Sequence, residues 1–216
     1  MAKTLATRTK FQIAKTYGPS VTMSAITNAA EAVATLASGH GVQVGDYLEI
    51  TSGWGNLNNR VVRVGAVSGD AVTLEKFNST SSSKFPAGAG IGSVRRITGW
   101  DQLSQVKDVS TAGGEQQWTD GTSLDDDVEI KMPTIKSGRT MTFEIFDDPN
   151  LPWYATVEAA SDATVNTGLL IIPPNNSKIV ANALWSLLKE PNIRKNEVLT
   201  TTVSLAFAAE SMRYAA

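Results

Sequence analysis

The stretch HGVQVGDYLEITSGWGNLNNRVVRVGAVSGDAVTLE, from His40 to Glu75, contains three short runs in which apolar side chains occupy alternate positions. These apolar positions are Leu48 and Ile50, Val62 and Val64, and Val72 and Leu74. Turn-forming residues bound the runs at Gly45-Asp46, from Gly53 to Asn59, and at Ser68-Gly69-Asp70. A period of two between turns is typical of strands that bury one face. The stretch therefore predicts a β-meander, and we expect a mainly β protein.

The composition agrees with thin β layers joined by many turns. Only 42% of the 216 residues are hydrophobic and 17 are glycine, which suits such layers better than a thick helical core. We expect an N-terminal arm at residues 1–20, which has few large apolar side chains and ends at Gly18-Pro19. A single β-rich domain should follow at residues 21–216, although the length also allows two small domains.

Residue counts and patterns exclude several kinds of site. Cysteine is absent, so disulfides and thiolate metal sites are impossible. No N-terminal stretch combines basic residues with an unbroken apolar run, and no apolar run has the length of a membrane span. We therefore expect a soluble protein that is made in the cytoplasm and has no membrane partner.

Charge is distributed unevenly along the chain. The net charge of −2 and the pI near 5.5 argue against a general nucleic-acid binder, which would be strongly basic. The first seventeen residues carry only basic charges, at Lys3, Arg8, Lys10 and Lys15. Between Glu115 and Glu158, acidic residues outnumber basic ones by 10 to 3. A basic arm beside an acidic body is compatible with contact between two copies of the chain, and also with a solvated tail and a solvated face.

The second half of the chain contains the clearest helix signal. Asp147 to Asp162 is predicted to be helical, with Asp148 or Asn150 as the cap, Pro152 in the first turn, and a stripe of Trp153, Val157 and Ala160 against the sheet. Further strands are predicted near 31–37, 94–98, 165–172, 178–188 and 197–209, with a turn at 173–176.

A hairpin is predicted from Val128 to Phe146. Val128, Ile130 and Met132 share one face, and Met141, Phe143 and Ile145 answer them across a turn at residues 136–139. Pro133 cannot donate a ladder hydrogen bond, so we expect it at an edge or a bulge.

Two segments suggest surfaces that meet something else. The last predicted strand places Thr200, Thr202, Ser204 and small alanines on the face opposite its apolar one, where a free surface usually carries lysine and glutamate. Such a face suits either a closely passing partner or plain solvent. The stretch 78–93, NSTSSSKFPAGAGIGS, is a long loop in which Phe85-Pro86 is a potential anchor for a partner. Disorder is the alternative for this loop.

The sequence contains no pattern of a catalytic or cofactor site. The single histidine, His40, lies beside a turn glycine and is interpreted as a loop residue. The acidic run Asp125 to Asp127 lacks the alternation of a calcium loop, and adjacent aspartates on a strand point to opposite faces. The glycines of PAGAGIGS lack the strand–turn–helix context of a dinucleotide loop. We expect no enzyme activity, no metal and no cofactor.

The order of several segments resembles a known family. GHGVQVGDYLEITSGWGNLNNRVVRV is followed by the loop with FPAG, then GGEQQW, then the predicted hairpin and FDDPNLPW. This order, from about Ala25 to Ala209, resembles the major tail tube proteins of long-tailed, non-contractile bacteriophages. The resemblance implies an antiparallel β-sandwich or half-barrel with one flanking helix, which closes into a shared inner β-barrel on oligomerisation.

The resemblance also implies a function and partners. Such proteins form hexameric rings that stack into the tail tube of the virion, assembled in the host cytoplasm, and genomic DNA passes through it without specific binding. Further partners would be the tape-measure protein and the tail tip and terminator proteins. By this resemblance, Val128 to Phe146 and Glu197 to Ala209 would supply inner-barrel strands.

Site residues are assigned as hypotheses on the same basis. The lumen or inner-barrel face would comprise Thr200, Thr202, Ser204, Glu129 and Glu144. The inter-ring interface would comprise Lys3, Arg8, Lys10, Lys84, Phe85 and Pro86. Deleting Ser81 to Gly90 is expected to leave a folded monomer that fails to stack. The alternatives are a tail-terminator or neck ring protein of the same fold, a saccharide-active enzyme domain, and an SH3-like nucleic-acid module.

Overall fold

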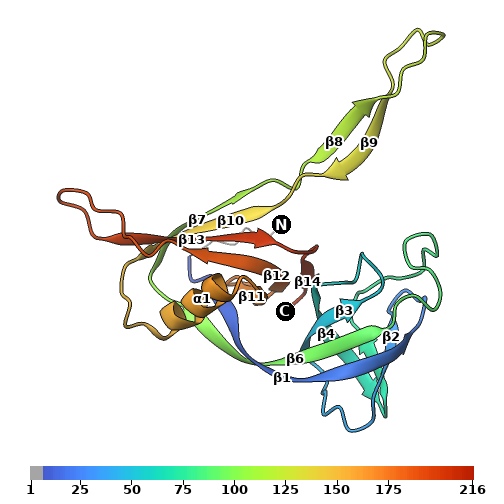
Figure 1. The fold of residues 1–216 in the computed structure, drawn as a ribbon, viewed down its shortest axis with the longest axis horizontal. Helices are drawn as coiled ribbons and strands as arrows, with labels where there is room; N and C mark the ends of the chain where they lie inside the picture. Colours follow the sequence, from blue (N-terminus) through green and yellow to red (C-terminus); the bar gives the residue numbers. More distant parts are fainter. Residues whose placement is uncertain (1–6) are drawn as a thin grey trace.

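The structure, a computed structural model, describes residues 7–216 and is mainly β (Figure 1). Its strands are β1 (Lys10–Ile26), β2 (Val33–Leu36), β3 (Tyr47–Ser52), β4 (Arg60–Ser68), β5 (Ala71–Leu74), β6 (Gly92–Leu103), β7 (Val106–Ala112), β8 (Gln116–Asp120), β9 (Lys131–Lys136), β10 (Thr140–Phe146), β11 (Asn166–Ile172), β12 (Lys178–Leu187), β13 (Thr200–Phe207) and β14 (Met212–Tyr214). The helix α1 covers Pro152–Ala163. The prediction of an antiparallel, mainly β fold with one helix is confirmed.

The predicted meander is part of a closed barrel. β3, β4 and β5 pair in sequence, and β2 closes the ring by pairing with both β5 and β1. β6 completes the barrel between β3 and β1. The alternating positions of the meander, Leu48, Ile50, Val62, Val64, Val72 and Leu74, are all buried in its core. The expectation of a single buried face fails at β3, where Tyr47 and Glu49 on the other face are also buried because the second half of the molecule covers them.

The second half is a curved sheet with its own core. Strands β1 and β6 run on from the barrel, and the sheet continues in the order β1, β11, β12, β13, β10, β7, with β14 added to the edge of β12. Its core contains Phe143, Trp185 and Leu205, and α1 packs against it through Trp153, Val157 and Ala160. The apolar stripe predicted for the helix is therefore confirmed, as are the strands predicted near 165–172 and 178–188.

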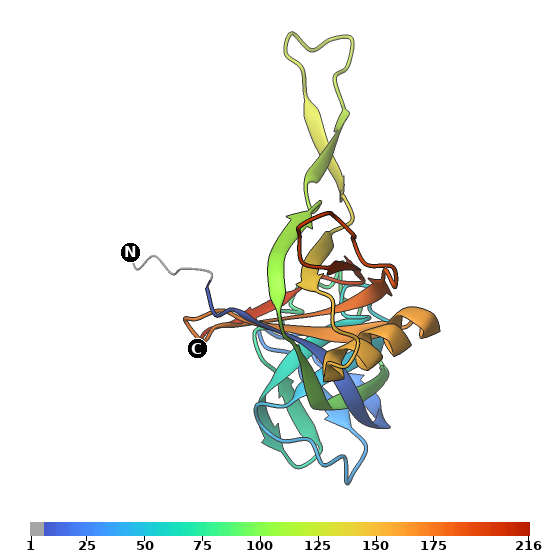
Figure 2. The same cartoon turned by 90° about the vertical axis from the view of Figure 1, so that its left-hand side faces the viewer.

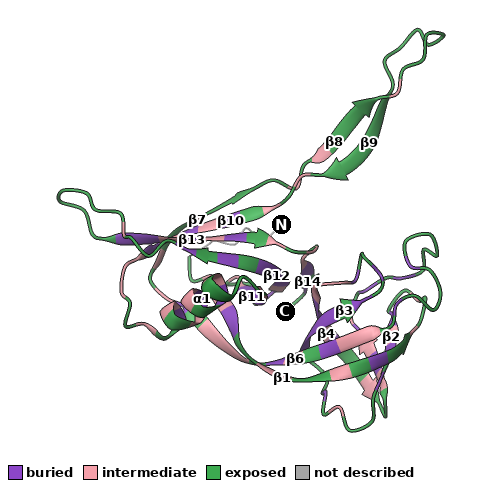
Figure 3. Ribbon diagram, viewed as in Figure 1, coloured by how far each residue is buried: buried purple, intermediate pink, exposed green. Residues whose placement is uncertain are grey.

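A two-stranded ribbon, β8 with β9, projects from this sheet away from the rest of the molecule (Figures 1 and 2). β7 leads into β8 through Gly113-Gly114, and β9 leads into β10 through Ser137-Gly138. Nearly the whole ribbon is exposed (Figure 3). A Cβ on Gly113 would lie only 1.9 Å from the carbonyl oxygen of Gly138, so only glycine permits these two segments to pass so closely.

The predicted hairpin from Val128 to Phe146 is wrong in its pairing. β9 pairs with β8, whereas β10 pairs with β7 and β13. Val128 and Ile130 lie in the exposed tip of the ribbon and face no residue of β10. Alternation identifies a strand but does not select its neighbour, and here the glycine-containing bends separate the ribbon from the sheet. Pro133 does lie in an edge strand, as expected, because both strands of the ribbon are edges.

Two predictions of element limits also need correction. The arm predicted to reach residue 20 is already a strand from Lys10 onward, because β1 pairs with β6 and β11. The helix begins at Pro152 with Leu151 at the cap position and no side-chain cap. Asp148 instead accepts a hydrogen bond from the backbone N–H of Asn150, at 3.1 Å, and closes the turn before the helix.

The loop at 78–93 is built into the barrel. Phe85 is buried and packs edge-on against Trp54 and Phe77. The indole Nε1–H of Trp54 donates to the carbonyl oxygen of Pro86 at 2.7 Å, and Ser52 Oγ donates to that of Gly90 at 2.8 Å. Disorder of this loop and Phe85 as an exposed anchor are both incompatible with these contacts. Deletion of Ser81 to Gly90 would remove part of the core, so the expectation that it leaves an intact fold is corrected as well.

Candidate functional face of the second sheet

One face of the second sheet is bare and lined by small side chains. The barrel covers this face over β11 and β12, where Leu170 and Val180 join the barrel core. Beyond them the face carries exposed or half-buried side chains over the rest of β12 and over β13, β10 and β7, and at one end Asn192 and Arg194 of the segment 188–199 border it. We call the following residues the small-residue face: Ser110, Ala112, Thr140, Thr142, Ser186, Thr202, Ser204 and Ala206.

Strand register places these side chains in cross-strand rows. One row runs Ser110, Thr142, Ser204, Ser186, and a second runs Ala112, Thr140, Ala206, Leu184. Because side chains alternate along a strand, the neighbouring residues Met141, Phe143 and Leu205 point to the opposite side and fill the core. Burying large side chains on one side while keeping small ones on the other therefore follows directly from the sequence pattern of β10 and β13.

The charges of this face lie at one end. Asp108, Glu144 and Thr202 form a third row, and Lys107 Nζ lies 2.8 Å from a carboxylate oxygen of Glu144. The hydrogen bond from Lys107 lowers the pKa of Glu144, so the carboxylate is ionised at neutral pH. The face is shallowly hollowed: a groove of about 370 Å³ lies beside the charged row, and one of about 580 Å³ lies over Thr142, Ser186 and Ser204.

The structure brings together four of the five residues predicted for a lumen face. Thr202 and Ser204 belong to the small-residue face, and Glu144 lies in the charged row at its end. Thr200 lies on the same side of β13 as Thr202, is buried at the end of the strand, and its side chain donates a hydrogen bond to Glu144. Glu129 lies in the tip of the ribbon, away from this face, and forms an ion pair with Lys131 at 2.6 Å.

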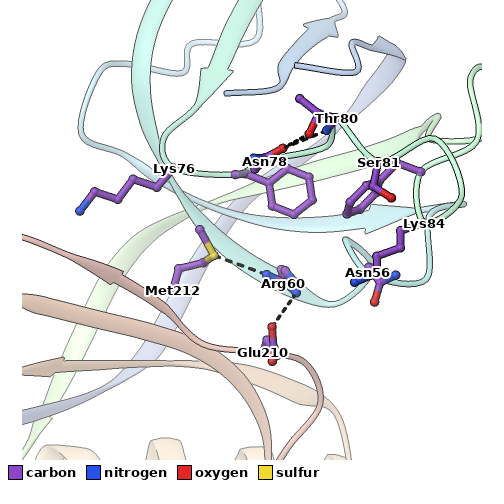
Figure 4. A pocket seen from close by; sticks show the side chains of 11 residues that line it. Asn56, Arg60, Lys76, Asn78, Thr80, Ser81, Lys84, Glu210 and Met212 are labelled. Carbon is purple, nitrogen blue, oxygen red and sulfur yellow. Dashed lines mark hydrogen bonds and ion pairs between the residues drawn. The ribbon is translucent and has the colours of Figure 1, made fainter. Parts of the chain in front are cut away.

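The residues predicted for an inter-ring interface fall into two groups. Arg8 and Lys10 are exposed at the start of β1, whereas the loop at 78–93 lies at its other end, where Asn28 Nδ2 donates to the carbonyl oxygen of Phe85. Lys84 and Pro86 are exposed, and Lys84 lines a pocket of about 380 Å³ with Arg60, Lys76 and Glu210 (Figure 4). Lys3 lies outside the described residues. Within one copy of the chain, Arg8 and Lys10 therefore lie at the opposite end of β1 from Lys84, Phe85 and Pro86.

The remaining polar candidates have structural partners. Nδ1 of His40 accepts from the backbone N–H of Val42, so Nε2 carries the proton and donates to the carbonyl oxygen of Gly69 at 3.1 Å. Asp126 accepts from the backbone N–H of Ser123 within the ribbon tip. Among residues 7–216, no group of three or more histidine, cysteine or acidic side chains is arranged to hold a metal ion. Over the same residues, no helix is long and apolar enough to cross a membrane.

Sequence reasoning missed the ribbon, and with it the exposed Trp118 and Ile135. A signal was present: Gly113-Gly114 and Ser137-Gly138 mark both ends of the excursion, and Gln116 to Asp120 is short enough for one strand of a ribbon. The strong alternation of apolar residues around Met132 and around Met141 led instead to the prediction that these two neighbouring runs pair with each other.

Comparison with known proteins adds an independent finding. The family model described as phage tail tube protein matches residues 52–216, which is more than half of the chain. A comparison with curated proteins finds no match.

Two solved structures show a weak likeness. One is the cryo-EM structure of the anti-feeding prophage baseplate, with 10% identity over 55% of this chain and 86% of that chain, and a TM-score of 0.39. The other is the sheath–tube complex of an extracellular contractile injection system in its extended state, with 11% identity over 50% of this chain and 80% of that chain, and a TM-score of 0.35.

Proposed function

The chain belongs to the phage tail tube protein family, and from that premise we propose that it polymerises as stacked hexameric rings into a tail tube through which genomic DNA passes during ejection. The small-residue face would line the lumen. The tube would form part of a long, non-contractile tail, assembled in the host cytoplasm, and its ends would meet the tape-measure, tip and terminator proteins. The protein would act as a building block without catalytic groups.

The observation that carries this proposal is the unpaired edge of β7 beside the small-residue face. β7 pairs with β10 along one side, and along its other side no residue of the described chain, 7–216, completes the ladder. An open edge is an aggregation hazard that proteins usually block, and ring closure by identical copies satisfies it. The edge strand and the bare face belong to the same sheet, so closing the edge with further copies would continue that face around an enclosed space.

The chemistry of the small-residue face suits a conduit for DNA. A cation on the wall would bind phosphates and release counterions, which would hold the DNA in place. Two cations line the groove beside this face within residues 7–216: Lys107 is paired with Glu144, and Arg194 lies 3.7 Å from Glu197. The two rows consist of Ser, Thr and Ala apart from Leu184 at the end of one row, so they give DNA no charge to bind and little bulk to pass.

Negative-stain electron microscopy of the purified full-length chain tests the proposal. We expect rings with sixfold symmetry and stacks of such rings. Rings that never stack would favour the terminator or neck alternative. A population that stays monomeric at high concentration would overturn the proposal, because the free edge of β7 would then need no partner.

A further inference from the structure

The pocket at the end of the barrel, of about 380 Å³, holds more positive charge than its own carboxylate can neutralise. Arg60, Lys76 and Lys84 line it, and of the described residues around it only Glu210 is acidic (Figure 4). Its volume lies within the range of small-molecule sites. None of the residues that line it belongs to the small-residue face.

The guanidinium of Arg60, at the start of β4, is largely buried and short of acceptors. Its side chain is 14% exposed. Nη2 donates to a carboxylate oxygen of Glu210 at 3.3 Å, and Nη1 donates to the thioether sulfur of Met212, a weak acceptor, at 3.5 Å. Nε is buried and has no hydrogen-bond partner among residues 7–216. A guanidinium carries five N–H donors, so most of the hydrogen-bonding capacity of Arg60 is unused.

Glu210 is shared among several cations. Its carboxylate lies 3.3 Å from Nη2 of Arg60 and 3.3 Å from Nζ of Lys136, the last residue of β9. The Arg139 guanidinium donates to the carbonyl oxygen of the residue before Glu210 at 2.9 Å. Lys84 adds a fourth cation, which has no acidic partner within residues 7–216. These four cations and one carboxylate leave the cluster with a net charge of +3.

The barrel side of the pocket supplies further donors. Lys84 and Asn56 belong to this side, whereas Glu210 belongs to the segment after β13 (Figure 4). Oδ1 of Asn78 accepts from the backbone N–H of Thr80 at 2.9 Å, which leaves the Nδ2 group of Asn78 as a donor. The loop that carries Lys84 is fixed by the buried side chain of the next residue, so its donors are held in place without a ligand.

Donors of these types suit an anion with several oxygens. A phosphate group accepts hydrogen bonds in more directions than a carboxylate, and guanidinium and ammonium groups are its usual partners. We propose that this pocket binds a phosphate group, either free or carried by a nucleotide, with Arg60 and Lys84 as its main contacts. The phosphate would supply acceptors that Arg60 lacks and would offset the excess positive charge. This inference goes beyond the proposed function, which assigns no ligand to the pocket.

Isothermal titration calorimetry of inorganic phosphate into the purified full-length chain tests the proposal. The buffer keeps pH and ionic strength constant with chloride, because unspecific attraction to a basic surface is screened equally by both salts. We expect saturable binding with one site per chain. Heats no larger than those of a matching chloride titration would overturn the proposal.

A lysine variant separates a built site from general attraction. Lys84→Gln should weaken phosphate binding roughly tenfold, the effect of about one charge-assisted hydrogen bond. Lys84 is exposed, so the variant should keep the circular dichroism spectrum of the natural chain. The matched control, Lys195→Gln, removes the same charge at an exposed position before β13, at the other end of that strand from Glu210, and should leave the affinity unchanged. Equal weakening by both substitutions would overturn the site.

Titrations with pyrophosphate and with adenosine diphosphate distinguish the two sources of phosphate. Tighter binding of adenosine diphosphate would support a site for a nucleotide, because the two ligands differ in the nucleoside. Equal affinity would support recognition of the phosphate alone. The outcome is independent of assembly: a chain that binds phosphate but forms no rings would overturn the proposed function and leave this inference in place.

Discussion

At the scale of single residues, Glu49 joins the two halves of the molecule. Its carboxylate on β3 accepts hydrogen bonds from Arg95 Nε of β6 at 3.1 Å and from Asn182 Nδ2 of β12 at 2.9 Å. Glu49 and Asn182 are both buried, so the hydrogen bond between them satisfies polar atoms that lie away from solvent. The barrel and the second sheet are therefore held together by a charged group as well as by apolar packing.

We predict that Glu49→Gln lowers the free energy of unfolding by about 1–3 kcal/mol, since the charge-assisted bond to Arg95 is lost and a buried amide must be satisfied instead. Urea denaturation measures the change. Glu129→Gln is the control: its ion pair with Lys131 is exposed, and such pairs contribute at most about 1 kcal/mol. Equal effects of the two substitutions would contradict the structural role of Glu49.

Ionisation of the Tyr17 hydroxyl should make the stability of the protein depend on pH in the alkaline range. The hydroxyl oxygen accepts a hydrogen bond from the backbone N–H of Gly168 at 3.0 Å. Burial raises the pKa of Tyr17 to about 12, against the smaller opposing effect of that hydrogen bond. The neutral phenol is therefore favoured by folding. Its contribution is complete below the unfolded pKa of about 10 and is lost as the pH rises from about 10 to 12.

We expect the free energy of unfolding to fall between about pH 10 and 12, and Tyr17→Phe to make that fall shallower, because one titrating group is removed. The fall in the free energy of unfolding will remain in part, because burial also raises the pKa of Tyr47 and Tyr214. At neutral pH the variant should be less stable than the natural chain, since the N–H of Gly168 loses its partner. Denaturant unfolding at a series of pH values measures both effects. An unchanged alkaline slope would contradict the assignment.

At the scale of elements, the loop at 78–93 shows how a glycine- and serine-rich segment becomes rigid. Its backbone carbonyl groups accept from Trp54, Ser52 and Asn28, and Ser79 is completely buried. Phe85 closes the end of the barrel between Trp54 and Phe77. Composition suggested flexibility, but one aromatic side chain and a few carbonyl contacts determine the conformation.

We predict that Phe85→Ala lowers the free energy of unfolding by about 3–5 kcal/mol, which is typical of a large buried aromatic side chain replaced by alanine. Lys84→Ala, at the neighbouring exposed position, should change it by no more than about 0.5 kcal/mol. Thermal or urea unfolding of the two variants compares them. If the two substitutions cost the same, Phe85 does not belong to the barrel core.

At the scale of the whole molecule, the barrel and the curved sheet have separate hydrophobic cores. Strands β1 and β6 run through both and contribute side chains to each core. The barrel covers only part of one face of the second sheet. The uncovered part holds the small-residue face, and the free edge of β7 and the ribbon adjoin it. All three features that point to assembly thus belong to the second half of the chain.

We predict that Ser204→Lys makes assembled tubes retain DNA, because a lysine in the row with Thr142 and Ser186 would face the lumen and bind phosphates. Retention should fall steeply as salt is raised. The control is the same substitution at Ser68, an exposed position of β4 in the barrel. Co-sedimentation of tubes with DNA distinguishes the two. Equal retention by both variants would show that the small-residue face does not line the lumen.

The sequence by itself determined the meander, the strands β11 to β13, the helix stripe of Trp153 and Val157, and the small residues of β13. Each of these depends on periodicity within a few neighbouring residues, which the chain displays directly. Only the tertiary structure decided that the barrel closes through β2 and β1, that β9 pairs with β8 instead of β10, and that Phe85 is buried. These outcomes depend on contacts between residues far apart in the chain and on two glycine bends. Local patterns define strands and their faces, whereas strand partners are selected by the packing of the whole molecule.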